Sequence, residues 1–323
     1  MKPCWGRACR RPGLGLGLLL LVVGVLCLAG CGGSTGGVSV HVQSVFISYY
    51  YVLPGHEPGE PFTARLGDRV QLLPFGRSDA TTVPLPSGVT WSSSLPAVAS
   101  VDADGYVTAQ ALGVTEVTCT YAGLTSDPLT VTVEAVGPQP GAQFYPLGLA
   151  YHWSYTGTAV EPTAVGPAAE EVTLTVTCSA QVVIDGEVWW ELEIRGTDPA
   201  QPAGAQWLRQ EGQGLLDWAQ GSQWWVLQEP LEGGNTWVDP ADLEHHWEIV
   251  STTVSVTVPA GTYAGCLQVV EHWITGTGIP YTTTAWLAPG VGTVRTLTAY
   301  TDPNTHLPVE NEQKLVTYQL GPV

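Results

Sequence analysis

The amino-acid sequence predicts an all-β protein, in which an antiparallel β-sandwich is followed by a larger antiparallel β domain, a curved sheet or partly open barrel. Short runs rich in β-branched residues recur along the chain between clusters of Pro, Gly, Ser and Asp, as in antiparallel sheets. No segment of 12 residues holds a helical period. A Pro- and Gly-containing linker at residues 137–142 divides the 323 residues. Because a domain averages about 150 residues, we expect two.

Residues 1–30 have the organisation of an export signal. Four basic residues and no acidic ones occupy the first 11 positions, and Leu14–Leu28 is an apolar run closed by small residues. A membrane-spanning helix needs about 20 apolar residues, so this run is too short to span and indicates a cleaved signal peptide. An uncleaved N-terminal anchor helix is the alternative.

The end of the apolar run, Leu28-Ala29-Gly30-Cys31, resembles a bacterial lipobox. The resemblance implies cleavage before Cys31 and acylation of this residue with palmitate-type chains, so that the membrane itself becomes a partner through the lipid anchor. Two or more acyl chains hold a protein on a membrane more firmly than one. Residues 31–37 would then form a Gly-rich tether, and the protein would be an extracytoplasmic, membrane-anchored lipoprotein at the cell surface or outer envelope.

Charge and cysteine content narrow the classes of function. Without residues 1–30, 7 basic residues face 29 acidic ones, a net charge of −22, so no nucleic-acid partner is expected. Cys119 alternates with apolar neighbours and is predicted to be a buried thiol, which leaves Cys178 and Cys266 as a candidate disulfide. No CxxC or Cys-His spacing typical of zinc or redox sites occurs, and we expect no metal and no cofactor.

The first domain is expected at residues 38–136. The alternation of Val117, Cys119 and Tyr121 with polar residues predicts a strand that is buried on one face. Short strands this dense, with turns between them, are typical of a sandwich. The predicted strands are Val38–Val42, Val45–Ser48, Val70–Phe75, Val89–Trp91, Val98–Val101, Tyr106–Ala109, Val114–Tyr121 and Leu129–Glu134.

Three stretches of this domain carry a family resemblance. Residues 89–102 contain Trp91-Ser92-Ser93 and Val101-Asp102, and they are followed by Gly105-Tyr106-Val107-Thr108-Ala109 and by Gly113–Thr118. Together they resemble bacterial immunoglobulin-like domains of group 2. The resemblance implies an Ig-like sandwich of the kind found in surface and adhesive proteins, often as a spacer, and it identifies no binding surface.

The second domain is expected at residues 143–323 and holds 11 of the 13 Trp residues. Asp185-Gly186 between two apolar runs predicts a hairpin turn. The predicted strands are Val172–Val176, Gln181–Ile184, Val188–Ile194, Gln206–Gln210, Gly214–Trp218, Trp224–Leu227, Trp247–Thr257, Leu267–His272, Thr282–Leu287, Val294–Ala299 and Leu315–Gln319.

A weaker resemblance covers the second domain in outline. Val258–Cys266, Trp286–Val294 and the pair Tyr145–Gly148 and Trp153–Tyr155 resemble β-rich domains of uncharacterised bacterial lipoproteins. The resemblance implies no catalytic residue. The Gly and Pro residues in these stretches are suited to tight turns ahead of strands.

No motif in the chain indicates catalysis. The nucleophile and metalloprotease motifs Gly-x-Ser-x-Gly, Ser-x-x-Lys and HExxH are absent. The densest polar cluster lies at residues 242–248, where His245 and His246 would point to opposite faces of a strand and could not easily share an ion; we interpret it as a solvated loop. Glu191 and Glu193 are interpreted as a solvated strand face. We therefore expect no catalytic residue, no metal site and no enzyme.

The Trp-Trp pairs are the most informative remaining feature. Trp189-Trp190 and Trp224-Trp225 are adjacent in sequence, so one ring of each pair should face inward and the other outward. Outward rings are candidate contacts for a glycan, an envelope component or a protein; packing against neighbouring loops is the alternative. The sequence favours a non-catalytic binding or structural protein. The alternatives are a carrier with a lipid-filled cavity and a hydrolase with an unrecognised site.

Overall fold

The computed structural model describes residues 42–49, 59–78, 81–85, 87–135, 140–163, 166–196, 204–212, 214–219 and 222–321. Residues 1–41, with the expected signal peptide, Cys31 and the tether, lie outside the described residues. The described chain is almost entirely β-structure, as predicted, and its one helical element is the 3-10 turn η1 (Pro140–Gln143). No helix within it is long and apolar enough to cross a membrane.

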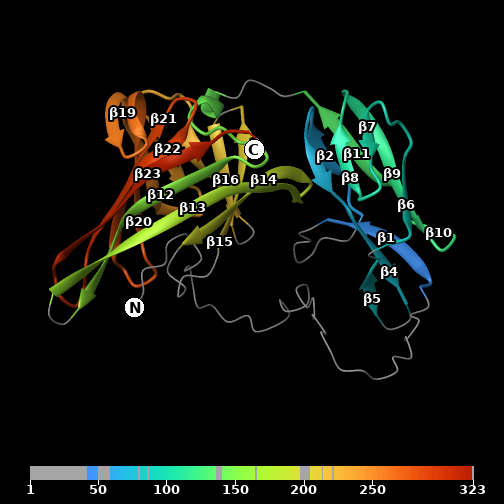
Figure 1. The fold of residues 1–323 in the computed structure, drawn as a ribbon, viewed down its shortest axis with the longest axis horizontal. Coiled ribbons are helices and arrows are strands. Elements are labelled where there is room, and N and C mark those ends of the chain that lie inside the picture. The colour runs from blue at the N-terminus through green and yellow to red at the C-terminus, as the bar shows by residue number, and fades with distance from the viewer. Residues whose placement is uncertain are drawn as a thin grey trace.

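The N-terminal unit is a sandwich of short strands (Figure 1). One sheet has the order β2-β11-β9-β6, with β10 added on β9; β1-β4-β5 and β3-β8-β7 form smaller sheets. The strands are β1 (Ser44–Ser48), β2 (Phe62–Arg65), β3 (Arg69–Gln71), β4 (Leu73–Arg77), β5 (Thr82–Pro84), β6 (Val89–Ser93), β7 (Ala99–Val101), β8 (Tyr106–Ala109), β9 (Gly113–Tyr121), β10 (Leu124–Thr125) and β11 (Leu129–Glu134).

The alternation predicted for this unit places its core. In β9, Val117 and Cys119 are fully buried, whereas Glu116 faces solvent. In β11, Leu129, Val131 and Val133 are buried in the same cluster. β2 pairs with β11 in parallel, and its Phe62 is buried in the same core.

The C-terminal unit is one antiparallel meander of twelve strands. The ladder order is β17-β16-β15-β14-β13-β12-β23-β22-β21-β20-β19-β18. The strands are β12 (His152–Thr163), β13 (Gly166–Ile184), β14 (Glu187–Gly196), β15 (Gly204–Glu211), β16 (Gly214–Ala219), β17 (Ser222–Gln228), β18 (Thr236–Asp239), β19 (Asp242–Val258), β20 (Gly261–Ile274), β21 (Pro280–Ala288), β22 (Gly292–Thr301) and β23 (Pro308–Gln319).

This meander curls but does not close. Among the described residues no backbone ladder joins its two end strands, β17 and β18. They meet instead through a side chain, because Trp237 Nε1 donates a hydrogen bond to the carbonyl oxygen of Trp225 at 2.8 Å. The expected curved, partly open sheet is therefore confirmed.

Two local features allow the sheet to curl. The register between β19 and β20 shifts repeatedly, and bulges of this kind bend a strand and increase its twist. At Gly157 the backbones of β12 and β23 approach so closely that an added Cβ would overlap the carbonyl oxygen of Glu312. Glycine is required there because it has no side chain to displace.

The inside of the curl is filled by aromatic side chains. Trp153, Trp224, Trp237, Trp247 and Trp286 are all buried in one cluster with aliphatic residues from most of the twelve strands. Trp153 Nε1 donates to the carbonyl oxygen of Val291 at 2.6 Å, so its polar group is satisfied at no cost to the packing. A core dominated by Trp explains much of the Trp excess in this unit.

Candidate functional site

The two Trp pairs place their rings on different faces of the sheet. Trp190 of β14 packs against the main core, while Trp189 belongs to a second cluster on the opposite face. In β17, Trp224 is buried in the main core, and Trp225 contacts both clusters. All four rings are therefore at least partly buried by packing.

The second cluster lies on the outer face of strands β13–β17. We call it the outer aromatic cluster: Trp189, Trp207, Trp218 and Trp225 with Val182, Ile184 and Leu216. Trp207 and Trp218 pair directly across β15 and β16 and contact edge to face, with ring centroids 5.5 Å apart. The outer face of an antiparallel sheet is ordinarily polar, so a group of four Trp residues on it calls for an explanation.

A cavity of about 310 Å³ opens beside this cluster. Its aromatic lining residues are Trp218, which is partly exposed, and Trp189, which is buried; four other lining residues are charged or carry an amide. Among the described residues, the lining consists of Ile184, Asp185, Glu187, Trp189, Arg209, Trp218 and Gln223. These side chains come from five strands, β13–β17, and from the β13–β14 turn, so the sheet itself sets their spacing.

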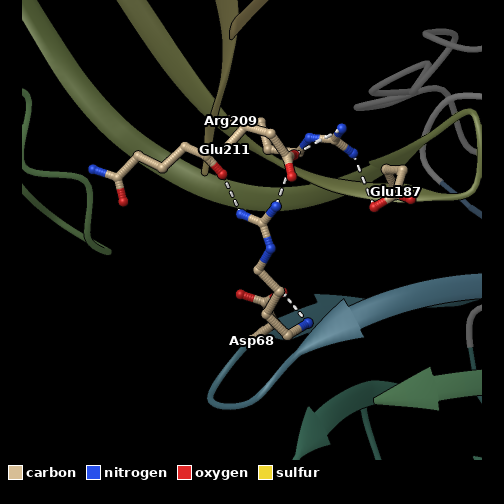
Figure 2. A network of polar contacts seen from close by, with 6 residues as sticks. Asp68, Glu187, Arg209 and Glu211 are labelled. Carbon is tan, nitrogen blue, oxygen red and sulfur yellow. Dashed lines mark hydrogen bonds and ion pairs between the residues drawn. The ribbon is translucent and has the colours of Figure 1, made fainter. Parts of the chain in front are cut away.

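Arg209 is the central charge of the cavity wall. Its guanidinium lies 5.0 Å from the centroid of the Trp189 ring, a cation–π geometry. Nη1 lies 2.9 Å from Glu187 Oε2, and Nη2 lies 3.0 Å from Glu211 Oε2; Figure 2 shows Arg209 between these two carboxylates. Burial raises the pKa of Glu187, and Arg209 acts in the opposite direction. The ion pairs therefore fix the guanidinium over the ring.

The same network continues into the N-terminal unit. Arg65 of β2 donates to the carbonyl oxygen of Gln210, and its Nη2 lies 2.8 Å from Glu211 Oε2. Next to it, Asp68 (labelled in Figure 2) accepts hydrogen bonds at 2.7 Å from the Arg65 backbone N–H and from Gln181 Nε2. Burial raises the pKa of Asp68, although these hydrogen bonds oppose the rise. We call this set of contacts the junction.

Apolar contacts reinforce the junction. The β13–β14 hairpin reaches across to β2 (Figure 1), and its Val183 and Val188 are buried in the core of the N-terminal unit. The predicted Asp185-Gly186 turn is present, with both residues at positive φ, and Gly186 accepts a hydrogen bond from the Thr63 N–H at 2.7 Å. The hairpin of one unit thus completes the core of the other.

Comparison with known families identifies the N-terminal unit. Residues 71–133 match the family model of the bacterial Ig-like domain, group 2. This stretch is a bacterial Ig-like domain. The match begins at the last residue of β3 and ends within β11. β1 and β2 lie outside it, although both pack on the Ig-like core. No curated protein matches the chain in sequence.

Two solved structures are similar to part of the chain. One is a protein from Parabacteroides distasonis assigned as a lipoprotein, at 15% identity and a TM-score of 0.34, with 55% of this chain and 98% of that one covered. The other, from Bacteroides fragilis, is assigned as an exported protein with a YmcC-like fold. Its identity and TM-score are the same, and 55% of this chain and 99% of that one are covered.

The polar cluster at residues 242–248 is not a solvated loop, and that interpretation of the sequence was wrong. These residues begin strand β19, and His245 is only 2% exposed. Its Nε2 lies 2.6 Å from Glu271 Oε1 and its Nδ1 lies 3.6 Å from Asp239 Oδ2. Glu271 comes from β20, so the partner of this buried histidine is set by the register of the sheet and not by the local sequence.

The two histidines nevertheless face opposite ways, as strand geometry predicts. His246 stacks on His272 across β19 and β20, with centroids 4.8 Å apart, and burial lowers the pKa of His272. Within the described residues, no group of three or more His, Cys, Asp or Glu side chains is arranged to hold a metal ion.

The three described cysteines are free and buried. Cys119 lies in the Ig-like core, as predicted. Cys178 and Cys266 both lie in the main core of the C-terminal unit, and the structure does not join them, so the candidate disulfide is absent from it. Burial raises the pKa of Cys178 to about 11, which keeps this thiol protonated and unreactive. None of the three is part of the cavity.

Proposed function

We propose that this chain is an exported, lipid-anchored, non-catalytic binding protein of the cell envelope, with its ligand site at the cavity beside the outer aromatic cluster. The observation that carries the proposal is the placement of Trp189 and Trp218 on the outer face of the sheet, around a cavity that also holds a fixed guanidinium. Small-molecule sites combine apolar surface with oriented polar groups; here Trp218 provides partly exposed aromatic surface and the other groups are mainly polar.

The Ig-like domain has a positioning role in this proposal. It is docked on the β13–β14 hairpin through Val183, Val188 and the Arg65–Glu211 ion pair, and the same hairpin provides Asp185 and Glu187 to the cavity. A tether on the N-terminal side would then attach the Ig-like domain, and through it the cavity, to the membrane.

The carrier alternative receives less support. A carrier needs space inside the curled sheet, and that interior is packed with buried Trp and aliphatic side chains. The hydrolase alternative also gains little, because the cavity carboxylate Glu187 is held in an ion pair with Arg209.

Two measurements test the proposal. Anchoring is tested in cells by comparing the full chain with Cys31→Ala, which we expect to lose acyl labelling and to leave the membrane fraction. Binding is tested by incubating purified residues 38–323 with washed envelope fragments and measuring sedimentation. We expect co-sedimentation that Trp218→Ala abolishes and that Trp273→Ala, a partly exposed Trp of β20 outside the cavity, leaves unchanged. Equal sedimentation of both variants would refute the site.

A further inference from the structure

We infer that the cavity binds a neutral carbohydrate, as a monosaccharide or as the terminal sugar of a longer glycan. This inference rests on the proposed function and adds the chemical class of the ligand. It is drawn from the composition, size and charge of the seven lining residues.

The lining combines two kinds of surface that a sugar requires. A pyranose ring has an apolar C–H face and a rim of hydroxyl groups. Trp218, whose ring is partly exposed, offers aromatic surface to the C–H face, while Asp185, Glu187 and Gln223 place hydrogen-bonding groups near the hydroxyl rim. An acyl chain would meet the same charged groups and leave them without water, which is costly.

Two buried donors at the cavity wall lack partners. Trp189 is 2% exposed, and its Nε1 has no hydrogen-bond partner among the described residues; the same holds for Nε of Arg209. Both side chains line the cavity. An unsatisfied buried donor costs free energy, and a hydroxyl oxygen of a bound sugar is an acceptor of the kind that both donors lack.

The charge of the wall argues for a neutral ligand. Asp185 and Glu187 provide two negative charges and Arg209 one positive charge, and Arg209 is already paired with Glu187 and Glu211. The whole chain carries a formal net charge of −18. A phosphorylated or acidic sugar would therefore be repelled both locally and at long range, and a cation would have to compete with a guanidinium.

The size of the cavity fits this class. A volume of about 310 Å³ is at the lower end of the range for small-molecule sites. It is sufficient for one or two sugar residues and too small for a lipid with several acyl chains. The aromatic rings are held by packing within the outer aromatic cluster, so the site needs little ordering when it binds.

The test is a titration of residues 38–323, monitored by intrinsic tryptophan fluorescence and by saturation-transfer NMR. The neutral probes are maltose, cellobiose, lactose and N,N′-diacetylchitobiose; the charged probes are glucuronic acid and glucose 6-phosphate. We expect saturable binding of at least one neutral probe, with Kd on the order of 1 mM, and no binding of the charged probes.

Variants tie the binding to the cavity. Trp218→Ala should weaken it about tenfold or more, and Gln223→Ala, a change at an exposed position that should not disturb folding, should weaken it measurably. Trp273→Ala should leave it unchanged. Saturation by no neutral probe, tighter binding of a charged probe, or equal affinities in all variants would overturn the inference.

A second arm separates failure of the inference from failure of the proposed function. Envelope fragments are treated with periodate, which cleaves vicinal diols of sugars, before the sedimentation assay. If fragments bind the protein and periodate abolishes binding, the carbohydrate class is supported. If fragments bind equally well after periodate, the carbohydrate inference falls while the binding role stands, and if untreated fragments do not bind, both fall.

Discussion

Arg65 of the Ig-like domain and Glu211 of the C-terminal unit form an ion pair of 2.8 Å across the junction. Glu211 also pairs with Arg209 at 3.0 Å, so one carboxylate joins the arginine that docks the Ig-like domain to the arginine of the cavity wall. The docking contact and the cavity wall are therefore physically connected. A substitution at Arg65 should alter the position of Arg209 in the cavity wall, and the reverse.

Replacing Arg65 should weaken the docking of the two units. Arg65→Ala removes the Glu211 ion pair and the hydrogen bond to the Gln210 carbonyl, and hydrogen bonds to charged groups contribute about 1.5–3 kcal/mol each. Since the pair is partly exposed, we expect a loss of about 1–2 kcal/mol. Urea denaturation of residues 38–323 measures it.

A matched control for Arg65 is Arg195→Ala. Arg195 pairs with Glu193 within a single strand and is largely exposed, so its loss should stay within about 0.5 kcal/mol. Equal effects of the two substitutions would show that Arg65 contributes no docking energy.

The hairpin valines should contribute to the stability of the Ig-like domain. Val183→Ala removes two methyl groups from the Ig-like core without changing any residue of that domain, and we expect a cost of about 1–3 kcal/mol. Hydrogen exchange of β9 and β11 should accelerate. Val250→Ala, at an exposed position of β19, should have no effect on these strands; protection unchanged by Val183→Ala would contradict the shared core.

Gly157 should tolerate no side chain. In Gly157→Ala the new Cβ meets the backbone carbonyl of Glu312, and since backbone cannot rotate away as a side chain can, β12 and β23 must separate. We expect a loss of several degrees in Tm, read by circular dichroism. Gly276→Ala is the control, because nothing lies within 4 Å of its added Cβ; equal Tm values in the two variants would exclude a close approach at Gly157.

Thiol chemistry tests the state of the cysteines. Residues 38–323 contain Cys119, Cys178 and Cys266, all buried and free, and burial raises the pKa of each. We expect no reaction of the native protein with Ellman's reagent and three thiols per chain in urea without reductant. A count of one would show that Cys178 and Cys266 are bonded.

Asp302 should contribute to the stability of the β22–β23 turn in a pH-dependent way. Its Oδ1 accepts hydrogen bonds from the backbone of Thr305 and Asn304 and from the Thr305 hydroxyl, and these bonds lower the pKa of the carboxyl group. A carboxyl group whose pKa is lower in the folded than in the unfolded chain stabilises the fold at pH values above its unfolded pKa. This stabilisation is lost as the pH falls through the folded pKa.

Thermal melts from pH 7 to pH 2 test this assignment. Asp302→Asn should be less stable than the native chain at pH 7, and the difference should shrink below about pH 4. Asp127→Asn, at an exposed position, should show neither effect. A difference between Asp302→Asn and the native chain that stays constant at all pH values would contradict the role of the carboxylate.

Local sequence predicted most strands but not their extent. β8 and β11 occur as expected, because alternation of apolar and polar residues decides them. β13 was predicted as two strands; a bulge between Cys178 and Ala180 lets the ladder continue through the polar interruption. β12 was missed because it contains Gly157 and Pro162, residues that are unfavourable in strands, and its role depends on β23 at the far end of the chain.

The site was less predictable for the same reason. The Trp pairs indicated that β14 and β17 contribute to a site. Arg209 could not be predicted as a site residue, because only the strand register places it over Trp189. Nothing near Val183 or Val188 in the sequence indicates that their shared face meets a different domain. The burial of His245 could not be predicted without its partner Glu271, which lies 26 residues away in the sequence. Pairing between distant strands decides each of these contacts.

The shared core has a consequence for the covalent connection between the two units. Because Val183 and Val188 lie inside the Ig-like core and Thr63 bonds to Gly186, the linker at residues 137–142 is not what holds the halves together. We therefore expect a chain that a protease cuts at this linker to stay associated through the shared core. The linker could then change in length or composition without altering the direction in which the cavity faces.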